Sequence, residues 1–197
     1  DLDRPCVVAR ERHGDASGLV VRVAHLRGTD RIERADEARA GKDLYATFDT
    51  TEGKIVVKLF AKDAPKTVEN FVGLATGEKE WKHPASGDRR VGEPLYNGTI
   101  FHRCIPEFMV QGGDPLSKDP SKRSAYGSGG LNLVKAETRA PKMTRGSVAA
   151  VMVPGKPDSA GAQFFIVLAD QPALDGQYTV FGHVSEGMEA LMKISEA

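Results

Sequence analysis

The stretch Phe101-His102-Arg103-Cys104-Ile105-Pro106-Glu107-Phe108-Met109-Val110-Gln111-Gly112-Gly113-Asp114 carries most of what this sequence says about its fold. Two short runs flank Ile105-Pro106, and this pattern predicts strands over 99–104 and 108–112. Because side chains alternate along a strand, we expect Arg103 and Gln111 on strand faces near the apolar pair Phe108 and Met109. The stretch therefore predicts an apolar surface edged by one permanent cation and one amide.

A second run, residues 162–167, adds another amide, Gln163, and another aromatic side chain, Phe165, with the same period of two. No phosphate-binding loop, Gly-x-Ser-x-Gly elbow or metal-ligand spacing of histidines accompanies the two runs. Together the runs predict a shallow apolar pocket with a guanidinium and two amides at its rim. We therefore expect a site with no metal and no cofactor.

These segments resemble the cyclophilin family of peptidyl-prolyl cis-trans isomerases, and the resemblance covers roughly residues 43–194. The shared segments occur in the family's order and at about its spacing: Phe101-His102-Arg103, Phe108-Met109, Gln111-Gly112-Gly113-Asp114, Gln163-Phe164-Phe165, Leu174-Asp175-Gly176 and Val180-Phe181-Gly182. The resemblance implies a mainly β fold, a closed eight-stranded antiparallel barrel capped by two α-helices. It also implies an enzyme that accelerates rotation about Xaa–Pro bonds and assists protein folding.

The resemblance further assigns roles within the pocket. Arg103 and Gln111 are expected to be catalytic, with Arg103 acting as an electrostatic donor. The expected substrate-binding residues are Phe108, Met109, Val151, Met152, Gln163, Phe165, Leu174 and Tyr178. The implied partners are proline-containing peptides and unfolded or folding proteins. A rival interpretation is a non-catalytic proline-peptide binding module or scaffold subunit with the same pocket.

Four departures from the family pattern bear on these assignments. The segment between Gly146 and Gln163 is two residues longer than is common. Counting from Gly146 gives Val151 and Met152 as main-chain binding positions, whereas counting back from Gln163 gives 153 and 154, the second a proline without an N–H. Ala173 replaces a Trp that helps many members bind cyclosporin, so we expect weak cyclosporin binding. Tyr178 stands where the best-known members carry His, and the sequence stops before the family's final strand.

Composition sets limits on the partners of the chain. The 197 residues contain 27 Lys and Arg against 27 Asp and Glu, so no overall charge attracts nucleic acid or an anionic membrane. No apolar run approaches the roughly 20 residues that span a bilayer. We therefore expect a monomer without nucleic-acid or membrane partners. We expect it in the cytoplasm, with export as the alternative because the sequence begins without Met.

Residues 1–43 differ from the rest in holding eight Arg but one Lys and no aromatic residue. We therefore divide the chain into an N-terminal extension over 1–43 and an isomerase domain over 44–197. Alternation over 18–26 predicts an extra strand. This strand is expected to complete the barrel in place of the final one. The alternative is an attachment, targeting or assembly element.

Residues 44–77 show the clearest local pattern. Alternating residues on either side of Glu52-Gly53 predict a β-hairpin. A helix is expected next, capped by Asp63, with Pro65 in its first turn and Gly77 at its end.

Overall fold

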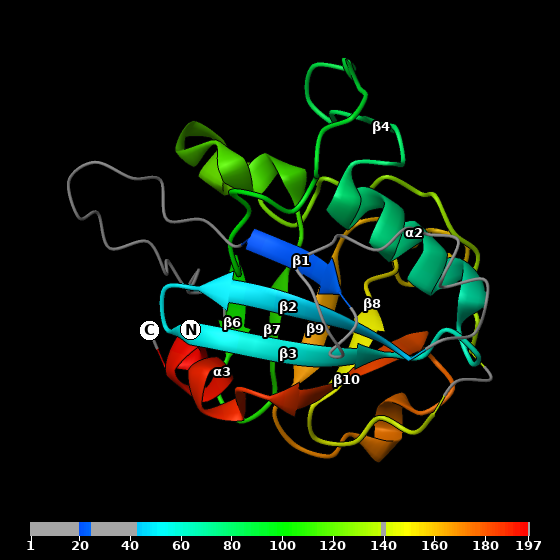
Figure 1. Ribbon diagram of the computed structural model, residues 1–197, viewed down its shortest axis with the longest axis vertical. Helices are drawn as coiled ribbons and strands as arrows, with labels where there is room; N and C mark the ends of the chain where they lie inside the picture. The colour runs from blue at the N-terminus through cyan, green and yellow to red at the C-terminus, as the bar shows by residue number, and fades with distance from the viewer. Residues whose placement is uncertain (1–19, 25–42, 139–140, 197) are drawn as a thin grey trace.

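The computed structural model describes residues 20–24, 43–138 and 141–196 (Figure 1). Within these ranges the chain forms ten β-strands and two α-helices, α2 (Pro65–Thr76) and α3 (Met188–Ser195). The strands are β1 (Val20–Ala24), β2 (Leu44–Thr50), β3 (Gly53–Leu59), β4 (Trp81–Lys82), β5 (Arg89–Arg90), β6 (Arg103–Ile105), β7 (Met109–Gly112), β8 (Ser147–Ala150), β9 (Phe164–Val167) and β10 (Val180–Glu186). Three 3-10 turns cover Pro115–Lys118, Pro120–Ala125 and Pro172–Leu174.

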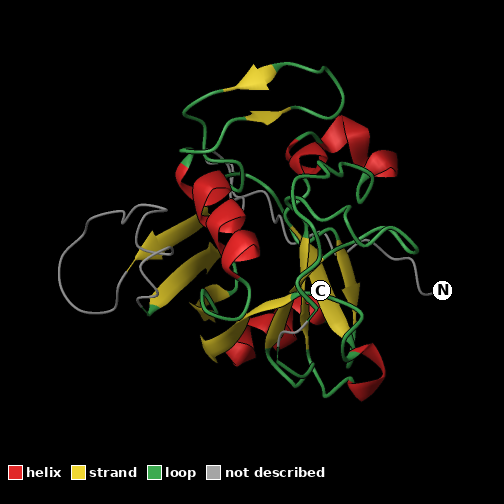
Figure 2. Cartoon of the chain, turned by 90° about the vertical axis from the view of Figure 1, so that its right-hand side faces the viewer, coloured by secondary structure: helices red, strands yellow, loops and turns green. Residues whose placement is uncertain are grey.

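Eight of the strands form one antiparallel sheet in the order β1-β2-β3-β10-β8-β9-β7-β6. The sheet curls, with α2 and α3 at opposite ends of it (Figures 1 and 2). In the part of the chain that the structure describes, β1 and β6 are the two ends of this order and do not pair. The expected closed eight-stranded barrel is therefore not shown. The molecule has the curled sheet and the two helices of that prediction, but the sheet is open between β1 and β6.

The hairpin of β2 and β3 follows the alternation in its sequence. Its register pairs Thr50 with Gly53, so the two loop residues are Thr51 and Glu52, one position earlier than the predicted turn at Glu52-Gly53. Leu44, Ala46 and Phe48 are fully buried, while the residues between them are partly exposed. One face of the hairpin therefore belongs to the core, and this is why the sequence predicts the register.

Helix α2 begins differently from what the sequence predicts. Its N-cap residue is Ala64, whose side chain makes no capping hydrogen bond, so the prediction that Asp63 caps the helix is wrong. Instead, the carboxylate of Glu137 accepts hydrogen bonds from the backbone N–H groups of Lys66 and Thr67, at 3.2 and 2.8 Å. The helix ends at Gly77, whose φ of 80° gives the left-handed cap that the sequence predicts.

The main core lies between the curled sheet and the two helices. Phe71 of α2 packs against the rings of Phe48, Phe164 and Phe181, with centroids 5.3 to 6.2 Å apart. Leu191 and Ile194 of α3 are fully buried in the same cluster. Fully burying apolar side chains of this size contributes roughly 1.5–3 kcal/mol each, so the contacts of the two helices with the sheet stabilise the fold.

Strand β1 lies antiparallel to β2, with Val20 opposite Asp49 and Ala24 opposite Tyr45. It falls inside the range 18–26 where the sequence predicts a strand. Its position beside β2 gives that strand a hydrogen-bonding neighbour on each side. Whether β1 stands in for a final strand stays a prediction, as does the division at residue 43. The rest of the N-terminal extension lies outside the described residues.

Two further segments depart from a plain barrel. The short β4–β5 hairpin projects from one end of the molecule in both views (Figures 1 and 2). Two 3-10 turns follow β7, over Pro115–Lys118 and Pro120–Ala125. Neither described helix is long and apolar enough to cross a membrane.

Candidate active site

Strand pairing brings the predicted site residues into one row. Arg103 on β6 lies opposite Gln111 on β7, and Gln111 lies opposite Phe165 on β9. Phe165 in turn lies opposite Ala149 on β8. Directly opposed residues in an antiparallel sheet point to the same face, so a guanidinium, an amide and an aromatic ring follow one another across three strands.

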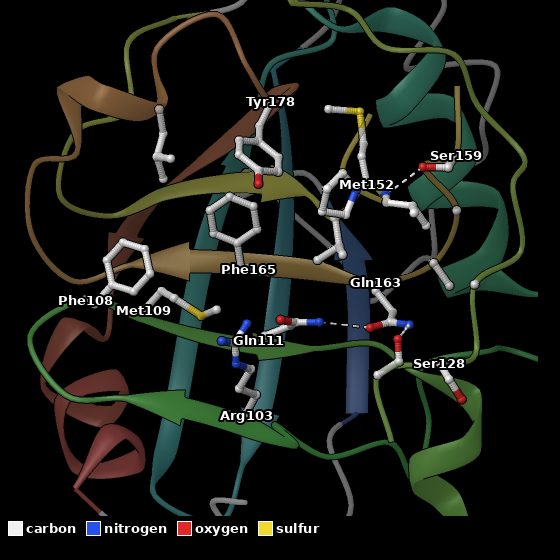
Figure 3. Close-up of a pocket in the computed structure, with 18 residues that line it drawn as sticks. Arg103, Phe108, Met109, Gln111, Ser128, Met152, Ser159, Gln163, Phe165 and Tyr178 are labelled. Carbon is white, nitrogen blue, oxygen red and sulfur yellow. Dashed lines mark hydrogen bonds between the residues drawn. The ribbon is translucent and has the colours of Figure 1, made fainter. Parts of the chain in front are cut away.

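A pocket of about 430 Å³ opens on this face (Figure 3). All ten residues to which the sequence assigns a role line it: Arg103, Phe108, Met109, Gln111, Val151, Met152, Gln163, Phe165, Leu174 and Tyr178. The structure thus brings together residues that lie up to 75 positions apart in the chain. Their chemical roles remain predictions.

The floor of the pocket is apolar. Met109 and Phe165 are buried in a second small core cluster, against which Phe108, Leu174 and Tyr178 pack while remaining partly exposed. The rings of Phe165 and Tyr178 meet edge to face, with centroids 5.2 Å apart and an interplanar angle of 84°. Such a pairing holds Phe165 in place and leaves an apolar surface open to a small ring.

The two glutamines form a buried chain of amides. Gln111 Nε2 donates to Gln163 Oε1 at 3.0 Å, and Gln163 Nε2 donates to the carbonyl oxygen of Gly127 at 3.0 Å. Figure 3 shows the remaining carbonyl oxygen of Gln111 facing the guanidinium of Arg103. The amides are therefore arranged with an acceptor toward the cation.

Arg103 is exposed at the edge of the pocket. Within the described ranges, its guanidinium forms no ion pair and no hydrogen bond. A guanidinium stays protonated and presents five donors in a rigid fork. Arg103 therefore supplies a positive charge with free donors beside an apolar wall.

The long segment after β8 favours the first of the two predicted registers. The N–H of Val153 donates to Ser159 Oγ at 2.7 Å, and its carbonyl accepts from the N–H of Lys156 at 2.9 Å. The N–H of Val151 is also taken, by the carbonyl of Gln163. Among residues 43–138 and 141–196, no backbone group of Met152 has a hydrogen bond, so Met152 offers free main-chain groups at the pocket.

Part of the pocket wall is formed by residues that the sequence did not predict to lie there. Gly127, Ser128 and Gly130 line the pocket on the side of the amide chain, and Ser159 lines it on the side of Met152. The run Gly127-Ser128-Gly129-Gly130 is the one available signal, because small residues allow a backbone to approach a ligand closely. In contrast, Ala173 is exposed and does not line the pocket, although its neighbour Leu174 does.

His102 lies beneath this wall and is buried, in keeping with a structural residue. Neither of its ring nitrogens has a hydrogen-bond partner among the residues that the structure describes. Burial lowers its pKa, an effect opposed by the nearby carboxylate of Asp114. The described residues contain no group of three or more His, Cys, Asp or Glu side chains that could hold a metal ion.

Comparisons with known proteins agree on one family. A family model described as "Cyclophilin type peptidyl-prolyl cis-trans isomerase/CLD" matches residues 45–197. Peptidyl-prolyl cis-trans isomerase B of Streptomyces anulatus is 40% identical over 158 residues, which cover 79% of this chain and 83% of the relative. The probable peptidyl-prolyl cis-trans isomerase A of Mycobacterium leprae is 38% identical over 142 residues, 72% of this chain and 73% of that protein.

A solved structure supports the same conclusion. A cyclophilin-type isomerase of Cryptosporidium parvum, crystallised in the presence of the dipeptide Ala-Pro, superposes with a TM-score of 0.58 at 28% identity. The match covers 77% of this chain and 84% of that one. The motifs, the curled sheet, the pocket and these relatives agree, and the chain belongs to the cyclophilin-type family of peptidyl-prolyl cis-trans isomerases.

Proposed function

We propose that this isomerase works by electrostatic stabilisation of a twisted Xaa–Pro bond by Arg103, and that it assists protein folding. Resonance keeps the bond planar and sets a rotation barrier of about 18–20 kcal/mol. When the bond twists, the resonance is lost and the prolyl nitrogen gains a localised lone pair. A donor aimed at that nitrogen therefore stabilises the transition state more than the ground state.

The observation that carries this proposal is the free guanidinium of Arg103 beside an apolar floor. In the proposed complex, the proline ring rests on the side chains of the floor residues, with Phe165 beneath it. The fork of Arg103 then lies at the prolyl nitrogen, on the side to which Gln111 presents its carbonyl oxygen. Rotation needs no nucleophile and no proton transfer in this scheme, so the residues present are sufficient.

The peptide backbone is proposed to bind along the rim. The free N–H and carbonyl of Met152 offer one donor and one acceptor to a peptide group. Gln163 lies on the same side, because its carbonyl accepts the N–H of Val151, the neighbour of Met152, and its amide is held by Gln111 and Gly127. Two anchoring points on one side of the proline leave the other side free to rotate.

The proposed substrates are proline-containing peptides and folding chains. The Cryptosporidium relative was crystallised with Ala-Pro, a ligand of the size that this pocket accommodates. Cyclosporin is expected to bind weakly, because Ala173 lacks the large apolar ring and the N–H of a Trp.

The test is an exchange measurement on a short Xaa–Pro peptide, which reports both binding and the rate of cis–trans exchange. We expect saturable binding with an exchange rate far above the spontaneous one, which has a time constant of tens to hundreds of seconds. Saturable binding without acceleration would instead identify a proline-peptide binding module. The exposed position of Ala173 and the free Met152 backbone make that the second candidate.

A further inference from the structure

We propose that Asp114 is a positioning residue for Arg103, acting through residues 127–130 and the two glutamine side chains. We call residues 127–130 the rim segment. The inference deepens the proposed function, because it explains what keeps an acceptor aimed at the catalytic guanidinium. Asp114 lies outside the pocket and touches no substrate in this scheme.

Asp114 ties the rim segment to the end of β7. Its side chain is fully buried, and Oδ2 accepts hydrogen bonds from the N–H groups of Gly127 and Gly129 at 2.6 and 3.2 Å. Oδ1 accepts from the N–H of Leu116 at 2.8 Å, which fixes the carboxylate itself. Hydrogen bonds from backbone N–H groups to an ionised carboxylate are among the stronger ones in proteins.

The fit around this carboxylate is close. A Cβ added at Gly129 would overlap Asp114 Oδ1, so only a glycine lets the backbone approach the side chain in this way. Among the described residues, the N–H and hydroxyl of Ser128 donate to the carbonyl of Ala125, and the N–H of Gly130 donates to the carbonyl of Ser128. Those bonds shape the turn but do not tie it to the sheet. In the described part of the chain, the hydrogen bonds that tie this turn to the sheet side come from Asp114 and Gln163.

The link through Gln163 has a direction. A carbonyl oxygen can only accept, so the carbonyl of Gly127 requires the NH₂ end of Gln163. The carbonyl end of Gln163 then faces Gln111 and requires its NH₂ end. This leaves the carbonyl end of Gln111 toward Arg103, as Figure 3 shows. The orientation of both amides is therefore set at Gly127, the residue that Asp114 holds.

Loss of the tether would release that orientation. If the carbonyl of Gly127 moves away, Gln163 and Gln111 lose the partner that selects one amide orientation over the flipped one. A flipped Gln111 would present an NH₂ group to the guanidinium, and two donors repel each other. Arg103 would then spend part of its time away from the position in which it meets the prolyl nitrogen.

The first experiment is Asp114→Asn, which keeps the shape but places an NH₂ group against backbone donors. We expect kcat for an Xaa–Pro peptide to fall by about tenfold, equivalent to about 1.4 kcal/mol, with KM changed by less than about twofold. KM is expected to change less than kcat, because the apolar floor and the Met152 anchor are untouched and only the Gln163 anchor is loosened. The matched control is Asp119→Asn, whose side chain caps the neighbouring turn through Ser121 and does not contact the rim segment.

A double-mutant cycle with Gln163→Ala separates positioning from a general structural effect. If Asp114 acts through Gln163, then Asp114→Asn will lower kcat no further once Gln163 is gone. Fully additive losses would overturn the proposal, because independent effects add. Unchanged kcat in a folded Asp114→Asn chain would overturn it as well.

A measurement on the unaltered chain covers the case in which Asp114→Asn does not fold. NMR scalar coupling across the hydrogen bond from Gln163 Nε2 to the Gly127 carbonyl is expected, and its absence refutes the chain of amides. The proposed function and the positioning role of Asp114 can be refuted separately. An unaltered chain without turnover refutes the proposed function, whereas normal turnover in a folded Asp114→Asn variant refutes only the positioning role.

Discussion

Replacing Arg103 with Ala should remove most of the catalysis and leave the fold intact. Arg103 is exposed and has no partner among the described residues, so its loss strands no buried charge or hydrogen-bonding group. Surface substitutions of this kind usually change the free energy of unfolding by less than about 0.5 kcal/mol. The variant should therefore have nearly the same melting temperature as the unaltered protein.

The catalytic loss is larger because, among the residues that the structure describes, Arg103 is the one charged side chain that lines the pocket. Removing a preorganised donor from a comparable site typically lowers kcat by about a hundred- to a thousandfold, or roughly 2.7–4 kcal/mol. Arg103→Lys should fall in between, because an ammonium keeps the charge but lacks the planar fork. Binding should change little, since the apolar floor and the Met152 backbone remain.

Peptide exchange measured by NMR checks all of this in one sample, because it gives both the dissociation constant and the exchange rate. Arg123→Ala is the matched control, an exposed arginine on a 3-10 turn outside the pocket. Full activity in folded Arg103→Ala would refute electrostatic catalysis by this residue. Equal losses in Arg123→Ala would show that the effect is one of general charge.

Five further outcomes follow from the structure. Phe165→Ala should lower the free energy of unfolding by roughly 3 kcal/mol, a small loss for a buried Phe because the pocket is open to water. It should also raise KM, and urea titration and kinetics measure the two effects. Turnover should be nearly flat from about pH 6 to 8, because no proton moves in the proposed step and guanidinium does not titrate there; a bell-shaped profile contradicts that. The free energy of unfolding should fall as the pH drops below about 6.5, by at most about 1.4 kcal/mol per pH unit, and should stay constant above it. The cause is the lowered pKa of buried His102, because the unfolded chain then binds the proton at a higher pH than the folded one. His102→Gln should abolish this dependence in melting experiments at about pH 5 and about pH 7.5. Ala173→Trp should tighten cyclosporin binding by about ten- to a hundredfold in calorimetry. Deletion of residues 1–40 should lower the melting temperature by exposing the edge of β2, and an equally stable remainder would speak against barrel completion.

The local patterns of this sequence predict its pairing well. Alternation in the β2–β3 hairpin and around Ile105-Pro106 predicts which residues share a face, because a period of two leaves little freedom of register. The exact pairing of Arg103 with Gln111 was not predicted, because the observed register is centred on Glu107 and not on Ile105-Pro106. The resemblance adds the contributions of β9 and of the turn that carries Leu174, which no local pattern joins to the pocket.

Contacts made over long sequence distances are what the sequence does not predict. The link from Gln163 to Gly127 spans 36 residues, and each end is unremarkable in its own segment. The capping assignment of Asp63 fails for the same reason, since a suitable residue next to a helix competes with a better placed one from elsewhere. Closure of the barrel likewise depends on strand ends that meet only through the whole fold.

The cap on α2 also bears on the order of folding. Glu137 comes 70 residues after Thr67, whose N–H and hydroxyl both donate to its carboxylate. Such a contact requires closure of a long loop, which slows folding, so the first turn of the helix is completed late. Hydrogen exchange at the amides of Lys66 and Thr67 should therefore report when the distant segment docks, and a peptide containing the helix alone should fray at its start.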